Sequence, residues 1–176
     1  MRIILATHAD DAELQDEGLK GPAYEIACAL AGEVGRQVVS RSRVAAVYTA
    51  PQPSAVATAG HLAQELSLPQ PSALPALGEG IEGETLAALR RVQSSAWTAI
   101  ERLKEDHGAD DQLLLVTPPL TVQAVVCRAL TMPVEDFQRF RIDHGSLTII
   151  EFRAQQNRTI LVSLNETCHL AGLEAP

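Results

Sequence analysis

The residue best placed for chemistry is His8, which follows a short apolar run at the start of the chain. Ile3, Ile4 and Leu5 predict a buried strand, because a strand covered on both faces is continuously apolar. Ligands of open α/β sheets bind at the carboxyl ends of strands. A histidine at that point can serve as a nucleophile or a general base. The alternative is that His8 only satisfies backbone groups of the loop.

Hydrophobic periodicity predicts the elements that position His8. Short apolar runs predict strands, and apolar residues spaced by three or four predict helices. The predicted strands are 3–6, 44–49, 113–117, 147–152 and 159–164, and the predicted helices are 24–34, 55–66, 85–106, 122–130 and 134–140. This order predicts an α/β fold, a three-layer α/β/α sandwich with a mostly parallel central sheet and a final antiparallel hairpin. Residues 1–176 are expected to form one domain.

The strand at 113–117 should lie in the middle of the sheet, beside the first strand. Both runs are short and apolar, and both lead into polar or proline-containing loops. Their pairing would bring His8 and Pro118 to the same rim of the sheet.

Composition excludes several classes of function. The net charge of −8 argues against a general binder of nucleic acid or of anionic membranes, since either would need a basic face. No run is long and apolar enough for a membrane span, and no signal peptide is expected, so a cytoplasmic location is predicted. Cys28, Cys127 and Cys168 are odd in number and widely spaced, which favours reduced core cysteines over disulfides or a zinc site.

Five stretches together resemble the histidine phosphatase superfamily, the phosphoglycerate-mutase-like proteins. They are RIILATHAD, VYTAPQPSAVATA, LLLVTPPLTVQAVVC, DHGSLTIIEF and LVSLNETCHL. They are similar to the family's Arg-His-Gly strand, its Tyr-Ser-Ser-Pro segment, the strand of its second histidine, its Asn-Gly-Ser-Leu-Thr strand and its Leu-Asn-Asp-Thr-Ala-His-Leu terminus. The resemblance spans nearly the whole chain and implies a phosphoglycerate-mutase-like fold.

The resemblance also implies a phosphoryl-transfer site. In the family the first histidine takes up the phosphoryl group, two arginines and a second histidine hold its charge, and a carboxylic acid protonates the leaving oxygen. His8 matches the nucleophile. Thr7 and Ser54 stand where the family has its arginines, and Pro118 replaces the second histidine. The acid position is matched by Glu79 or Glu82, with no firm choice between them.

These departures weaken phosphate binding. A charge-assisted hydrogen bond contributes roughly 1.5–3 kcal/mol. The loss of three such donors would therefore cost about 5–9 kcal/mol of phosphate stabilisation, which corresponds to a thousand-fold to a million-fold. Five acidic residues also bring negative charge towards the opening: Asp10, Asp11, Glu79, Glu82 and Glu84. The leading interpretation is therefore a pseudoenzyme. It would be a non-enzymatic binding or regulatory domain for an unidentified protein or small molecule, without metal or other cofactor.

Two alternatives stay open. One is a weak phosphomonoesterase that uses His8 as the phosphoryl acceptor. The other comes from HADDAEL, which resembles the opening of zinc-dependent sugar de-N-acetylases and would place His8, Asp10 and Asp11 at a metal site. That site needs a further histidine in a His-x-x-His type motif. The three histidines that could supply it stand isolated in the sequence: His107, His144 and His169.

Overall fold

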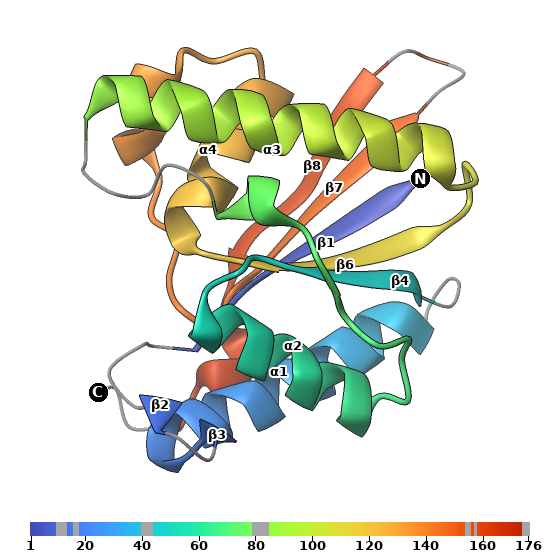
Figure 1. Ribbon diagram of the computed structural model, residues 1–176, viewed down its shortest axis with the longest axis vertical. Coiled ribbons are helices and arrows are strands. Elements are labelled where there is room, and N and C mark those ends of the chain that lie inside the picture. The colour runs from blue at the N-terminus through green and yellow to red at the C-terminus, as the bar shows by residue number, and fades with distance from the viewer. Residues whose placement is uncertain are drawn as a thin grey trace.

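The computed structural model describes residues 1–9, 14–15, 18–39, 44–78, 85–153, 156 and 158–173. A six-stranded sheet runs through the middle of the molecule in the order β5-β4-β6-β1-β7-β8 (Figure 1). Its strands are β1 (Arg2–Thr7), β4 (Val44–Thr49), β5 (Ser72–Ala73), β6 (Gln112–Thr117), β7 (Leu147–Arg153) and β8 (Arg158–Glu166). A separate two-stranded ribbon is formed by β2 (Leu14–Gln15) and β3 (Gly18–Leu19).

Helices cover both faces of this sheet. In Figure 1, α1 and α2 lie below the sheet, and α3 and α4 lie above it. The helices are α1 (Gly21–Val39), α2 (Pro53–Glu65), α3 (Leu86–Asp106) and α4 (Pro119–Ala129), with short 3₁₀ helices η2 (Pro75–Leu77), η3 (Val134–Arg139) and η5 (Cys168–Leu170). The predicted three-layer α/β/α fold is confirmed. Neither α1 nor α3 is apolar enough over its length to cross a membrane, and no other helix in the described ranges is.

The two central strands pair as the sequence predicted. β1 and β6 run parallel in a register that joins Ile3 to Leu113 and Thr7 to Thr117. Every residue of both strands is buried. Coverage on both faces explains why these strands are continuous apolar runs without polar alternation.

The sheet is parallel on one side of β1 and antiparallel on the other. β4 and β5 continue the parallel pairing beyond β6. β7 pairs antiparallel with β1, and β8 pairs antiparallel with β7, which confirms the predicted hairpin. The carboxyl ends of β1, β4 and β6 consequently meet at one edge of the sheet, on the left of Figure 1.

The burial of β6 generates a stability prediction. Leu114 is fully buried in the middle of the sheet, so Leu114→Asp places a carboxylate there without a partner. We expect a loss of about 3 kcal/mol or more in the free energy of unfolding, or loss of soluble expression. Denaturant titration measures the change.

The matched control is Leu86→Asp. Leu86 is the first residue of α3 and is 41% exposed, and an acid suits the positive end of a helix. Its free energy of unfolding should stay within about 0.5 kcal/mol of the parent. Equal losses in the two variants would contradict the central placement of β6.

Candidate functional site

His8 lies at the carboxyl edge of the sheet, one residue beyond β1. Only 2% of its surface is exposed. Pro118 lies one residue beyond β6, and the two residues before them, Thr7 and Thr117, are register partners. The prediction that His8 and Pro118 share a rim is confirmed.

Two helices begin at the same rim. α4 starts at Pro119, directly after β6, and α2 starts at Pro53, shortly after β4. Neither helix has a side-chain cap at its first residues. The first N–H groups of a helix lack internal partners and carry a partial positive charge, which favours an anion.

Ser54 adds a second polar group to this edge. It is the second residue of α2 and is 1% exposed, and its Oγ has no hydrogen-bond partner among the described residues. A buried hydroxyl without a partner costs free energy unless something else bonds it. Ser54 stands where the resemblance implies an arginine. The structure therefore gives this position a neutral donor at the first turn of a helix.

The imidazole of His8 is held in one orientation. Its Nδ1 lies 2.7 Å from the carbonyl oxygen of Ala9. A carbonyl oxygen only accepts hydrogen bonds, so the proton sits on Nδ1 and the lone pair of the neutral ring is on Nε2. The loop is tied to α2 by a bond from the Ala9 N–H to Thr58 Oγ1 of 3.3 Å.

A second histidine lies against His8. The ring centroids of His8 and His144 are 5.2 Å apart, and His144 Nδ1 donates to the His8 carbonyl oxygen over 3.1 Å. His144 is isolated in the sequence, but the antiparallel pairing of β7 with β1 returns the chain to this rim and brings His144 to His8. The sequence did hold a signal, since His144 stands within the DHGSLTIIEF stretch that resembles the family.

Thr7 fastens the turn that carries His144. Its hydroxyl donates to the Asp143 carbonyl oxygen over 2.7 Å and accepts from the Ser146 N–H over 2.7 Å. The His8 carbonyl also accepts from the Gly145 N–H over 3.3 Å. Thr7 replaces an expected arginine, and its side chain is used to join β1 to this turn.

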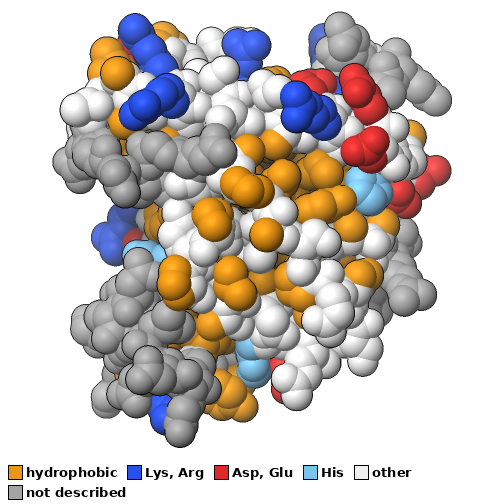
Figure 2. Space-filling view, in the orientation of Figure 1, with side chains coloured by type: hydrophobic (Ala, Val, Ile, Leu, Met, Phe, Trp, Pro, Cys, Tyr) orange, Lys and Arg blue, Asp and Glu red, His pale blue; other side chains and the backbone are white. Residues whose placement is uncertain are grey.

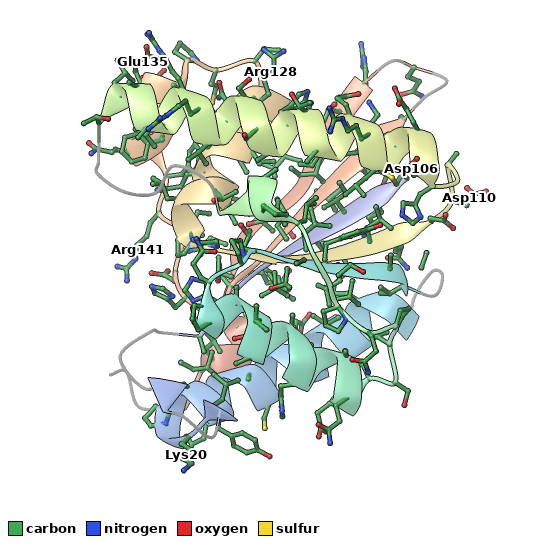
Figure 3. The ribbon with its side chains drawn as sticks, in the orientation of Figure 1. Lys20, Asp106, Asp110, Arg128, Glu135 and Arg141 are labelled. Atoms are coloured by element: carbon green, nitrogen blue, oxygen red, sulfur yellow. The ribbon has the colours of Figure 1, made fainter. Side chains whose placement is uncertain are left out.

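Asp143 is fixed from the other side. Its N–H donates to Asn165 Oδ1 over 2.8 Å, and Asn165 Nδ2 donates to its carboxylate over 2.9 Å. Partial burial opposes ionisation of Asp143, but hydrogen bonds from Asn165 and Arg141, with the charges of Arg141 and His144, outweigh it and lower the pKa of the carboxyl. Arg141 pairs with Asp143 and extends outward from this edge (Figure 3).

The expected acids fall outside the described residues. This holds for Glu79 and Glu82, and also for Asp10 and Asp11. The chain just before residue 79 is nevertheless held at the rim. The Leu77 carbonyl oxygen accepts from Thr117 Oγ1 over 3.0 Å and from Thr121 Oγ1 over 2.9 Å. Within the described ranges, no three His, Cys, Asp or Glu side chains gather in a way that could hold a metal ion.

A large groove lies elsewhere on the molecule. It has a volume of about 920 Å³ and runs between α3 and the segment from β4 to η2, with Tyr48, Leu74 and Leu103 in its walls. Figure 2 shows an apolar band across this face, bordered by basic and acidic side chains. It contains neither His8 nor His144, so we place the chemistry at the rim.

Comparison with known proteins decides the family. A model of the histidine phosphatase superfamily (branch 1) matches residues 73–167. The chain belongs to this superfamily. The resemblance seen in the sequence is confirmed, whereas a loss of the catalytic pocket is not shown by the comparison.

Named phosphatases are among the similar proteins. A 2-carboxy-D-arabinitol-1-phosphatase from Triticum aestivum is 29% identical over 101 residues, which are 55% of this chain and 20% of that protein. The chain thus matches about a fifth of the length of this curated relative. YhfR of Bacillus stearothermophilus has a TM-score of 0.75 at 15% identity, covering 96% of this chain and 98% of the other. The α-ribazole phosphatase from Shigella flexneri has a TM-score of 0.70 at 19% identity, covering 94% and 96%.

These matches correct the functional prediction. The chain was expected to be a non-enzymatic binding or regulatory domain, and that expectation is contradicted because its similar proteins are named phosphatases. The alternative of a phosphomonoesterase agrees with them better. The prediction had rested on the charges lost at three positions, Thr7, Ser54 and Pro118.

The turn that carries His144 generates a prediction at Gly145. This residue has φ +70°, and an added Cβ would lie 2.5 Å from Ile26 Cγ2. Gly145→Ala should therefore cost about 1–3 kcal/mol in the free energy of unfolding, through backbone strain and the clash. The shift of the denaturation midpoint measures it.

Gly60→Ala is the control, because Gly60 lies inside α2 with nothing within 4 Å of the added Cβ. Replacing a glycine inside a helix by alanine should raise the free energy of unfolding by about 0.5–1 kcal/mol. If Gly145→Ala were as stable as Gly60→Ala, the left-handed backbone of Gly145 and its close approach to α1 would be contradicted.

Proposed function

We propose that this protein is a phosphomonoesterase in which His8 is the phosphoryl acceptor. The observation that carries the proposal is the bond from His8 Nδ1 to the Ala9 carbonyl, because it leaves the lone pair on Nε2. Family membership and the named phosphatases among the similar proteins support it. The position at a strand end, beside two uncapped helix N-termini, suits an anionic substrate.

The proposed reaction has two steps. In the first, His8 Nε2 attacks the phosphorus of a phosphate monoester, a P–N bond forms and the P–O bond to the leaving alcohol breaks. The alcohol oxygen takes a proton from an acid, for which Glu79 or Glu82 remain the proposed residues. In the second step, water gives a proton to the carboxylate of that acid and attacks the phosphorus, the P–N bond breaks, and inorganic phosphate leaves with His8 and the acid restored.

The charge of the phosphoryl group would be met by an unusual set of groups. When it is protonated, the His144 ring carries a positive charge and offers a second donor at Nε2. Ser54 Oγ and the first amides of α2 and α4 add neutral donors. A neutral donor brings no positive charge to offset the negative charge of the phosphoryl group, whereas an arginine would. We therefore propose a slow enzyme, with Thr7 and Pro118 shaping the site and not binding phosphate.

Two wider properties are part of the proposal. Residues 1–176 would act as one domain, because β1 pairs directly with β6, β7 follows on its other side, and the site draws on both halves of the chain. The protein would work in the cytoplasm, where the three thiols, which form no disulfide in the structure, stay reduced.

Hydrolysis of an aryl phosphate tests the proposed role. The parent protein should release phosphate above the buffer rate, and His8→Ala should abolish that release. His144→Asn should lower kcat/KM about ten- to hundred-fold, as expected for one charge-assisted hydrogen bond. Phosphate release is followed at matched protein concentrations, with circular dichroism as the check on folding.

His107→Asn is the control. His107 is bonded to Tyr48 and lies outside the site, so its loss should leave the rate unchanged. Hydrolysis that survives in His8→Ala would overturn the proposal. If His144→Asn and His107→Asn had equal rates, His144 would have no part in the reaction.

A further inference from the structure

A cysteine of α1 and a histidine of α2 meet at the surface of the molecule. Cys28 on α1 is exposed, and its Sγ lies 3.4 Å from Nε2 of His61 on α2. The expectation that the cysteines lie in the core is wrong for Cys28 and for Cys168, because both are exposed, although both are free thiols. A thiol within hydrogen-bond distance of an imidazole has a base that can accept its proton.

Tyr24 completes the cluster. It precedes Cys28 by one helical turn, and its ring packs edge-on against His61 at a centroid distance of 5.1 Å. Its hydrogen bond to Cys28, followed by the charge of Cys28, raises the pKa of the Tyr24 hydroxyl. The Tyr24 hydroxyl, which can donate a hydrogen bond, therefore faces the Cys28 sulfur.

Space for a small molecule adjoins the thiol. A cleft of about 640 Å³ between α1 and α2 has Cys28, Arg36 and Glu65 in its walls. A guanidinium offers five N–H donors. Arg36 uses two of them in hydrogen bonds to the Glu33 carboxylate, at 2.9 and 2.6 Å. The cleft thus presents a guanidinium and a carboxylate beside the thiol, which complement the carboxylate and ammonium groups of an amino acid.

We infer that Cys28 is a thiol–disulfide exchange site for disulfides of amino-acid-derived thiols. His61 Nε2 takes the Sγ proton, and the thiolate attacks one sulfur of the incoming disulfide. A new S–S bond forms to Cys28 while the old one breaks. The departing thiolate takes the proton from His61. The products are a mixed disulfide on Cys28 and one free small thiol, so no further oxidant is needed.

Site-resolved peptide mass spectrometry after exposure to glutathione disulfide tests the inference. Cys168 is an internal comparison, because it is exposed but its neighbour His169 bonds Gly145 instead. Cys127 is buried and should stay unmodified. We expect Cys28 to react about tenfold faster than Cys168. His61→Gln should bring Cys28 down to the rate of Cys168 without changing the latter.

A control variant and a second disulfide probe complete the experiment. His107→Gln should leave both rates unchanged, and unchanged Cys28 reactivity in a folded His61→Gln variant would overturn the role of the imidazole. With the uncharged bis(2-hydroxyethyl) disulfide the preference for Cys28 over Cys168 should shrink. An equal preference for the two probes would contradict recognition by Arg36 and Glu65. Equal rates at Cys28 and Cys168 with glutathione disulfide would overturn the site itself.

Discussion

The pairing of β1 with β6 is the constraint on which the candidate site depends. Both strands are buried on both faces, so a slip of one residue would turn every side chain to the opposite layer. The register is therefore fixed, and Thr7 lies beside Thr117. His8 and the start of α4 are consequently held at one rim without needing contacts of their own.

The turn before β7 explains how a site with few arginines can still be assembled. The Thr7 hydroxyl and Asn165 hold Asp143 from two sides, and Gly145 provides the left-handed backbone that lets the turn approach α1. This arrangement places His144 against His8. An arginine at position 7 would contribute a charge to the rim but would lose the hydroxyl that fastens the turn. In the proposed site, the second imidazole would therefore come from the turn before β7.

The sequence predicted the fold well because its strongest signals are periodic. Leu113 to Val116 could only be a doubly covered strand, and the stripe of α3 recurs over many turns. A single residue carries no such repetition. His144 lies 136 positions from His8 and meets it only through the antiparallel return of β7, which periodicity does not place. Cys28 was misjudged for a related reason, since helical surroundings do not say which face of the helix a residue occupies.

In the proposed reaction, Nε2 of His8 carries the phosphoryl group during turnover. Its most direct test is to quench the protein under alkaline conditions while it hydrolyses an aryl phosphate, and to map phosphate on its peptides by mass spectrometry. We expect phosphohistidine at His8, linked through Nε2, because Nδ1 is occupied by its bond to Ala9. Sustained turnover with no phosphate on His8, or phosphate linked through Nδ1, would contradict it.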